Sequence, residues 1–302
     1  MIKLIASDMD GTLLDNQLRI SAENIQAIRR AQREGILFLA ASGRNESQIR
    51  PLLAEEGIKC PIIALNGAKL YDETGTELLS HELASKTVQG VLETLEQAEV
   101  HVEMTTSAGS LSNNKRKRLE AFAAYIQETN PSVGFEDALE IASREADELG
   151  IQFVSSYREV LKEPDVEVYK LSAYTEQDHN ILLPVKESLL QRFPDLAISS
   201  FHRSNLEINH LSAQKGLVLS QFAAQRGITA RHSMAIGDNQ NDLSMLQWAY
   251  YSVAMMNGSP QVKSIARHIT TTNDQHGVAR AIEKFTRLSP GSSLTSGNKS
   301  LK

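Results

Sequence analysis

The fold is decided by residues 2–13, IKLIASDMDGTL, in which an apolar run ends in two aspartates and a glycine. Ile2 to Ala6 is compact and rich in aliphatic residues, as expected for a buried parallel strand. Asp8 and Asp10 stand two apart, so their side chains share one face of extended backbone, and Gly11 permits the turn that follows. Open α/β sheets collect ligand-binding groups at the carboxyl ends of their strands. The stretch therefore predicts a first strand that leads into a functional loop.

A strand–helix alternation continues from this stretch. Ser21 can cap a helix that Gly35 closes, and strands at 36–41 and 61–65 flank a second helix at 45–56. This βαβαβ order predicts a parallel sheet with right-handed crossovers. After residue 209 the same rhythm returns, with helices expected at 213–225, from 241 and at 278–287, and strands at 233–236 and 251–254.

The middle of the chain has a different pattern, with several helical stretches among strands joined by short connections, which favours antiparallel pairing. We therefore expect an α/β fold with a Rossmann-like parallel-sheet core, formed by residues 1–83 and 206–287, and an α+β cap domain inserted at 84–205. A length of 302 residues leaves room for both. Residues 288–302 are rich in Ser, Gly, Asn and Lys, and we expect a flexible tail.

Composition narrows the class of function. Lys plus Arg number 31 against 37 for Asp plus Glu, a formal charge of −6, which argues against nucleic-acid binding. The single cysteine, Cys60, excludes an intramolecular disulfide and fits a reducing compartment as a small buried residue. Neither a signal-peptide region nor an apolar run of about 18 residues is found. We expect a cytoplasmic protein with no membrane contact, and infer no obligatory protein partner.

Two further stretches could bind phosphate. Ser42-Gly43-Arg44 follows the second strand and precedes a helix, where a hydroxyl and backbone N–H groups can hold phosphate oxygens. A simple helix cap explains Ser-Gly equally well. Lys215 opens a helix and could approach a phosphate oxygen as a mobile point charge, although such a lysine, taken alone, is more often solvated.

A third stretch, Gly237-Asp238-Asn239-Gln240-Asn241-Asp242, supplies the remaining oxygen ligands. The acidic groups of Asp8, Asp10 and Asp238 would repel one another beside a phosphate without a cation, and Mg²⁺ prefers such oxygen ligands. Zinc is disfavoured, because the eight histidines show no paired spacing and there is one cysteine. A polar loop with a helix cap is the plain alternative.

The two aspartates of the first stretch can divide one reaction between them. Asp8 could attack phosphorus and form an aspartyl-phosphate, while Asp10 protonates the leaving oxygen and later takes a proton from water. Phosphate monoesters hydrolyse so slowly without a catalyst that covalent catalysis, a cation and fixed positive groups are needed together. Asp-Gly punctuating a turn is the alternative for this motif taken alone.

These motifs, in this order, resemble the haloacid dehalogenase-like phosphatases, specifically the Cof-type subfamily with an α/β cap inserted between the second and third motifs. The resemblance covers about residues 2–285 and implies that Asp8 is the nucleophile. It implies that Asp10 is the acid/base whose main-chain carbonyl also meets Mg²⁺, and that Asp238 is the remaining metal carboxylate. It further implies phosphate contacts from Ser42, Gly43, the Met9 amide, Lys215 and Asn241, with Asp242 supporting the metal shell.

Weaker parts of the resemblance concern two other segments. Asn66-Gly67-Ala68 resembles a segment beside the site near the cap hinge, and Asn273-Asp274 resembles a late loop near the metal. Either could be turn chemistry alone. We expect Arg44 and Asn66 to support the site.

The expected function is a Mg²⁺-dependent phosphatase that acts on a small phosphate ester: a sugar phosphate, FMN, pyridoxal phosphate or 5-amino-6-(5-phospho-D-ribitylamino)uracil. A phosphomutase of the same fold, or an inactive module that binds phosphate esters, is the alternative. Four successive cations, Lys115-Arg116-Lys117-Arg118, could signal nucleic acid or reach an anionic substrate. We expect instead a solvated helix start in the cap.

Overall fold

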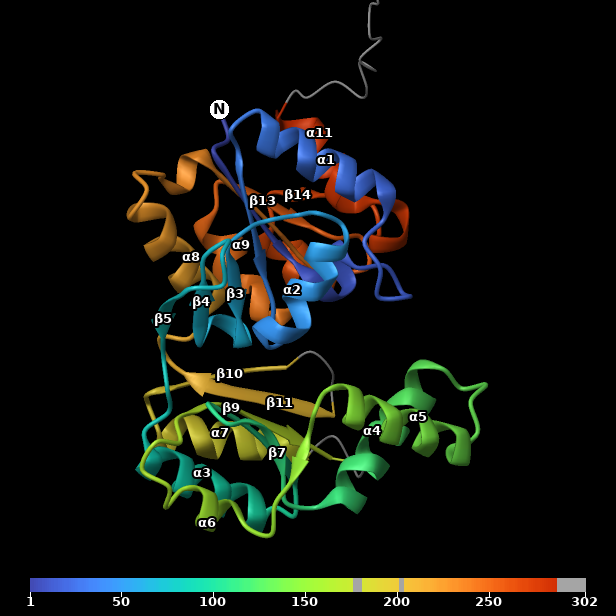
Figure 1. Ribbon diagram of the computed structural model, residues 1–302, viewed down its shortest axis with the longest axis vertical. Coiled ribbons are helices and arrows are strands. Elements are labelled where there is room, and N and C mark those ends of the chain that lie inside the picture. The colour runs from blue at the N-terminus through green and yellow to red at the C-terminus, as the bar shows by residue number, and fades with distance from the viewer. Residues whose placement is uncertain (176–180, 201–203, 287–302) are drawn as a thin grey trace, which may run out of the picture.

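An eight-stranded sheet organises the larger part of the molecule (Figure 1), in a computed structural model that describes residues 1–175, 181–200 and 204–286. The strand order is β14-β13-β12-β1-β2-β3-β4-β5. Pairing is parallel from β14 to β3 and antiparallel at β4 and β5. The strands are β1 Leu4–Asp8, β2 Leu37–Ala41, β3 Ile62–Ala64, β4 Lys69–Tyr71, β5 Glu77–Ser80, β12 Ser233–Gly237, β13 Tyr251–Ala254 and β14 His268–Ile269.

Helices cover both faces of this sheet, as the βαβ pattern predicts. Along β1, Ile5 packs on one face against apolar side chains of α1, α2 and α11, whereas Leu4 and Ala6 pack on the other against α8, α9 and α10. Ser21 caps α1 by accepting a hydrogen bond from the Asn24 N–H at 3.3 Å. The helices are α1 Ala22–Arg33, α2 Glu46–Glu55, α8 Lys215–Ala224, α9 Leu243–Trp248, α10 Pro260–Ile265 and α11 Gly277–Thr286.

The position of β1 gathers the predicted motifs at one edge of the sheet. β1 lies between β2 and β12, with Asp8 opposite Ala41 and Ser7 opposite Ile236. The carboxyl ends of these three strands are therefore neighbours, and the loops that follow them start side by side. This is where Asp8, Ser42 and Asp238 meet.

A second, six-stranded sheet has the order β10-β11-β9-β6-β7-β8. It carries its own apolar core, separate from those of the larger sheet. In Figure 1 its strands β10 and β11 face the larger unit, while α3, α6 and α7 cover its far side. The elements are α3 Ser85–Gln97, β6 His101–Thr106, β7 Gly109–Ser112, α4 Lys115–Thr129, α5 Phe135–Glu148, β8 Gln152–Phe153, α6 Tyr157–Val160, β9 Val168–Tyr174, α7 Leu182–Arg192, β10 Leu196–Ser199 and β11 Asn205–His210.

This smaller unit matches the expected α+β cap, and the predicted antiparallel pairing of its last two strands, β10 and β11, is confirmed. Because β11 extends to His210, we propose that the inserted domain ends there rather than at residue 205. The predicted flexible tail, residues 288–302, lies outside the described residues. Among the described residues no helix combines the length and the apolar character that crossing a membrane requires. Cys60 is buried, as expected.

The basic run at residues 115–118 requires a correction. Lys115, Arg116 and Lys117 are exposed at the start of α4, as expected for a solvated helix start. Arg118 is only 4% exposed, and its Nε donates to Glu103 Oε1 at 2.8 Å while its Nη2 contacts Glu145. The expectation was wrong for Arg118, because this position of α4 faces β6 and α5 rather than water.

Candidate active site

Asp8 and Lys215 meet at the centre of the site. Asp8 ends β1 with its side chain 7% exposed, and Lys215 begins α8 with its side chain fully buried. The Lys215 ammonium donates to Asp8 Oδ1 at 2.6 Å and to Asp242 Oδ1 at 2.7 Å. Lys215 is therefore not a solvated surface lysine, and the structure brings the first and third motifs together around its ammonium group.

Asp242 organises the loop that carries Asp238. Its second oxygen, Oδ2, accepts the backbone N–H groups of Asp238 at 2.9 Å and Asn239 at 3.0 Å. Asp238 is fixed further by Thr12, whose hydroxyl donates to Asp238 Oδ1 at 2.8 Å. The loop is thus tied both to α8 and to the turn after β1.

The turn after β1 requires glycine at residue 11. Gly11 has φ +73°, and a Cβ there would stand 2.7 Å from Asp238 Oδ2. The first motif and the third therefore approach each other more closely than a side chain at residue 11 would allow.

Three carboxylates crowd this region. One ligand atom each from Asp8, Asp238 and Asp242 can be chosen so that all lie within 4.8 Å of one another. Burial and the neighbouring Asp242 carboxylate raise the pKa of Asp8 well above its ordinary value, although Lys215 acts in the opposite direction. Burial and Asp242 also raise the pKa of Asp238, to about 6. For Lys215, burial is outweighed by Asp242 and Asp8, and its pKa is raised.

These residues fit a divalent cation. Three carboxylates against one ammonium leave a surplus of negative charge. Burial, together with Asp242, raises the pKa of Asp8 and of Asp238, so a nearby cation would stabilise both groups in their ionised form. The three carboxylates offer oxygen atoms, the type of ligand that Mg²⁺ prefers. The carboxylates of Asp8 and Asp238 could hold such an ion, whereas Asp242 is occupied by Lys215 and two backbone N–H groups.

Asp10 lies at the same edge of the sheet, but its side chain is paired with Arg44 instead of joining the acidic cluster. Its carboxylate, 46% exposed, accepts Arg44 Nε at 2.8 Å and also contacts Arg44 Nη2. The structure therefore places the Asp10 side chain beside the acidic cluster rather than within it, open to solvent and paired with the second motif. The expected metal contact of Asp10 was through its main-chain carbonyl, and it stays a prediction.

Ser42 and Gly43 are not used as a helix cap. Asn45 occupies the N-cap position of α2, and its backbone N–H donates to Gln48 Oε1 at 3.0 Å. Ser42 is buried and its hydroxyl accepts the Arg44 N–H at 3.1 Å. The helix-cap alternative is therefore wrong for this motif, and its predicted role in phosphate contact stays a prediction. Met9 follows Asp8 with its side chain in the core, so only its main chain can serve the site.

Asn66 joins the predicted phosphate contacts to the smaller unit. It lies in a left-handed turn, φ 60°, and is almost completely buried. Its Oδ1 accepts Asn241 Nδ2 at 3.0 Å, and its Nδ2 donates to Glu207 Oε2 at 2.9 Å. Asn66 is thus more than a turn residue, and it reaches Asn241, the remaining predicted phosphate contact.

Sequence reasoning missed two charged residues at this junction. Glu207 on β11 and Lys170 on β9 form a buried ion pair, with Lys170 Nζ 2.9 Å from Glu207 Oε1. The same Nζ donates to the carbonyl oxygen of Gly43 at 2.8 Å. The available signal was a charged residue within each of two apolar strand patterns, which indicates a polar partner buried elsewhere.

The late loop, which contains Asn273 and Asp274, forms hydrogen bonds with the turn after β1. Asn273 Nδ2 donates to the Leu14 carbonyl at 3.0 Å, and Asn257 Nδ2 donates to the Gly11 carbonyl at 2.7 Å. Asp274 Oδ1 accepts the Asn16 N–H at 3.0 Å. These contacts hold the backbone that carries the two aspartates of the first motif.

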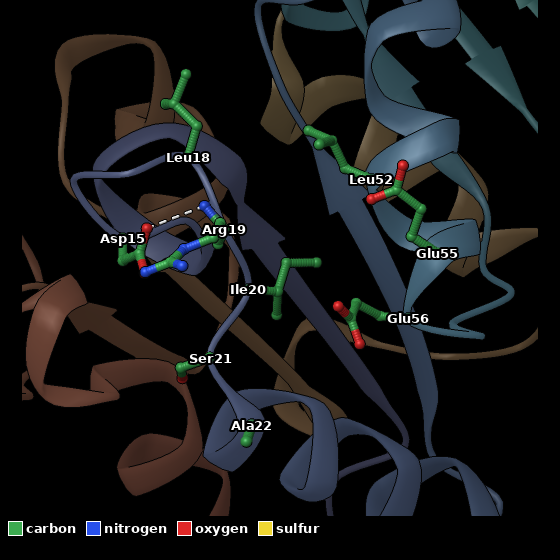
Figure 2. Close-up of a pocket in the computed structure, with 9 residues that line it drawn as sticks. All are labelled: Asp15, Leu18, Arg19, Ile20, Ser21, Ala22, Leu52, Glu55 and Glu56. Carbon is green, nitrogen blue, oxygen red and sulfur yellow. Dashed lines mark hydrogen bonds and ion pairs between the residues drawn. The ribbon is translucent and has the colours of Figure 1, made fainter.

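Two hollows among the described residues can be compared with the predicted site. The larger, about 500 Å³, lies between the loop after Leu14 and α2 (Figure 2), and Asp15, Arg19 and Glu55 are among its lining residues. It contains none of the predicted site residues. The smaller, about 320 Å³, lies between β10 and helices α8 and α9, includes Asn66 and Asn241, and has only uncharged lining residues.

Comparison with known proteins identifies the family. Residues 5–282 match the model of the haloacid dehalogenase-like hydrolases. The chain is 32% identical over 285 residues to the phosphatase YwpJ of Bacillus subtilis (strain 168), covering 93% of this chain and 99% of that one. It therefore belongs to the haloacid dehalogenase-like hydrolases, in their Cof-type branch, and is a phosphoric monoester hydrolase, as the motifs predict.

Two further similarities concern a named phosphatase and a solved structure. The 5-amino-6-(5-phospho-D-ribitylamino)uracil phosphatase YwtE of Bacillus subtilis (strain 168) is 32% identical over 286 residues, covering 94% of this chain and 98% of that one. A solved haloacid dehalogenase-like hydrolase from B. subtilis superposes with a TM-score of 0.83 at 30% identity, covering 94% of this chain and all of that one. The expected fold, a parallel-sheet core with an α+β cap, is confirmed.

Proposed function

We propose that this chain is a Mg²⁺-dependent phosphatase that hydrolyses a small phosphorylated metabolite through an aspartyl-phosphate on Asp8. The observation that carries the proposal is the contact of Lys215 with both Asp8 and Asp242 beside Asp238, because it assembles distant motifs around one buried carboxylate. The cation, held by Asp8, Asp238 and the Asp10 carbonyl, would supply charge neutralisation for the phosphoryl oxygens.

The protein groups would share the work as follows. Lys215 engages Oδ1 of Asp8, so the other carboxylate oxygen would attack phosphorus in line with the ester oxygen. The P–O bond to the leaving group breaks as the Oδ–P bond forms, and Asp10, which would take up a proton from solvent once it leaves Arg44, gives that proton to the departing oxygen. Asp10 would then accept a proton from the water that cleaves the aspartyl-phosphate. Arg44 must release the Asp10 carboxylate for this exchange.

The remaining predicted contacts would hold the phosphoryl oxygens. Ser42, Gly43 and Asn241, together with the Met9 amide, can offer hydroxyl, amide and backbone N–H donors. The smaller unit would cover the leaving group and exclude water. The lone buried thiol of Cys60 fits a reducing compartment, and we propose the cytoplasm as the location.

The ester is proposed from a set: sugar phosphates, FMN, pyridoxal phosphate and 5-amino-6-(5-phospho-D-ribitylamino)uracil. The similarity to YwtE makes the ribitylaminouracil phosphate the first ester to test. Activity would be measured as release of inorganic phosphate with saturating Mg²⁺ and again with EDTA.

Asp8→Asn tests the proposed nucleophile. The amide keeps the shape of the side chain but cannot attack phosphorus, so we expect turnover to fall below detection while the protein stays folded. Phosphate release at near wild-type rate by Asp8→Asn would reject the nucleophile. Transfer to a second hydroxyl without free phosphate would indicate a phosphomutase, and ester binding without turnover by the wild type would indicate an inactive module.

A further inference from the structure

A buried carboxylate beside a predicted phosphate site needs an explanation, because it would repel the substrate. Glu207 is such a group: it lies on β11, is buried, and stands beside Gly43 and Asn66. A Cβ on Gly43 would come within 3.1 Å of Asn66 Oδ1 and 3.3 Å of Glu207 Oε1. Burial would raise the pKa of Glu207, but Lys170, Asn66 and Lys215 lower it overall, so the group is ionised.

An ionised carboxylate accepts hydrogen bonds and donates none. Glu207 Oε2 therefore requires a donor from Asn66, which supplies Nδ2 at 2.9 Å. Asn209 also requires a donor from Asn66. Its Nδ2 donates to the main-chain carbonyls of Leu65 and Tyr169, so its Oδ1 faces Asn66 Nδ2 at 3.3 Å.

With both hydrogens of its amide directed at the smaller unit, Asn66 can present only its oxygen to the third motif. Asn66 Oδ1 accepts Asn241 Nδ2 at 3.0 Å. The amide of Asn241 is thereby fixed in one of its two orientations. Its second N–H hydrogen remains for another acceptor, and its oxygen is turned away from Asn66.

We propose that Glu207 is a positioning residue that sets the orientation of the Asn66 amide and, through it, of the Asn241 amide, so that Asn241 offers N–H rather than C=O to the phosphoryl group. The inference rests on the proposed function, in which Asn241 contacts the phosphoryl oxygens. Lys170 completes the arrangement, because it neutralises Glu207 and ties it to the Gly43 carbonyl.

The arrangement also couples the two units. Lys170, Glu207 and Asn209 belong to the smaller sheet, whereas Gly43, Asn66 and Asn241 belong to loops of the larger one. Withdrawal of the smaller unit would remove both acceptors from Asn66 at once and leave its amide free to turn. Phosphate affinity is therefore highest when the smaller unit is in place.

The test replaces one hydrogen-bond acceptor of Glu207 by a donor. In Glu207→Gln the side-chain oxygen must face Lys170, which has only donors, so the new NH₂ group faces Asn66 and demands an acceptor from it. We expect the inhibition constant of inorganic phosphate and the KM for an ester to rise at least about tenfold, the cost of one misdirected hydrogen bond to a charged group.

Adding Lys170→Met to Glu207→Gln should partly restore phosphate affinity, because the Gln oxygen can then turn back to Asn66. If Glu207 mattered only through charge or packing, the double variant would be no better than the single one. The Glu207→Gln change should also have little further effect on phosphate affinity in an Asn241→Ala background, since the two act as a unit. Glu103→Gln, which alters another ion pair of the smaller unit, is the matched control and should leave phosphate affinity unchanged.

Wild-type phosphate affinity in Glu207→Gln, no recovery in the double variant, or additive effects of Glu207→Gln and Asn241→Ala would each overturn the inference while the proposed function stood. If the wild type itself released no phosphate from any ester and was not inhibited by phosphate, the proposed function would fail first. A double variant without the buried charge pair keeps the test informative should Glu207→Gln fold poorly.

Discussion

Thr12 shows how a single hydroxyl prepares the predicted metal site. It is buried and donates to Asp238 Oδ1 at 2.8 Å, so it fixes one carboxylate of the acidic cluster. Groups that orient a metal ligand in this way typically contribute about 10- to 100-fold to metal affinity. Thr12 is therefore a more sensitive probe of the cation than the ligands themselves, whose loss would also remove buried charge.

We expect Thr12→Val, which keeps the shape but removes the donor, to raise the Mg²⁺ concentration for half-maximal activity about 10- to 100-fold. The Mg²⁺-dependent rise in unfolding temperature should shift to higher concentrations in parallel. Ser244→Ala, which removes a hydroxyl on helix α9 that accepts the Gly216 N–H, is the control. An unchanged Mg²⁺ requirement in Thr12→Val would argue against Asp238 as a ligand.

Among the elements, α4 is anchored by one arginine. Arg118 links it to Glu103 on β6 and to Glu145 on α5. Arg118→Gln would leave the partly buried carboxylates of Glu103 and Glu145 without their cation, so the loss of unfolding free energy should exceed about 1 kcal/mol but stay below the roughly 3–5 kcal/mol that breaking a fully buried pair costs. Replacing exposed Lys115, Arg116 and Lys117 together by Gln should change the free energy of unfolding by less than about 1 kcal/mol, because these side chains are solvated.

Urea unfolding of the two variants would measure this difference. Equal stability of Arg118→Gln and the triple surface variant would contradict the anchoring role. Phosphate-ester kinetics of the triple variant would separately test whether any of the three exposed cations reaches an anionic substrate, since its KM would then rise.

The sequence predicted most elements correctly where the signal is local. Strand β13 was predicted at its observed bounds, 251–254, because its apolar pattern lies within the element itself. Helix α10, only six residues long, was missed although Ser259 caps it and Pro260 opens it. Its six residues are too few to show the apolar spacing of a helix.

For the candidate site too, residues marked by a local pattern were predicted and residues without one were missed. Motif order predicted the meeting of Asp8, Lys215 and Asp238, because each follows a strand of one parallel sheet or opens a helix beside it. Lys170 and Glu207 were missed because their pairing depends on the register of two strands far apart in the sequence. The inward turn of Arg118 likewise depends on residues 103 and 145, which no local pattern connects to it.

At the scale of the whole molecule, the two connections between the units run side by side. His81 on the first stacks with His210, the last residue of β11, where the second begins, with ring centroids 6.1 Å apart. A Cβ on Gly67 would come within 2.9 Å of the Gln214 backbone. Movement of the smaller unit must therefore bend both connections together.

Whole-molecule stability should depend on pH through His101. Burial, then Arg118 and Lys117, lower the pKa of this histidine from 6.5 to about 4. The unfolded chain binds a proton at His101 between these values while the folded protein does not, so stability is full above pH 6.5 and falls as the pH approaches 4. The loss should reach up to about 3 kcal/mol.

His101→Gln carries no titrating group and should flatten this part of the stability profile. Urea unfolding at pH 7, 5.5 and 4.5 would compare it with the wild type. Parallel profiles for the two proteins would show that other groups cause the acid destabilisation.

Cys60 gives the molecule a practical property. It is the single cysteine of the chain, lies in the core, and burial raises its pKa to about 12. A thiol of this kind hardly ionises near neutral pH and should stay silent toward maleimide reagents. Two cysteines introduced at exposed Glu55 and Lys117 would then be the only reactive labels. Energy transfer between fluorophores at these positions could follow opening and closing in solution with the native cysteine left in place.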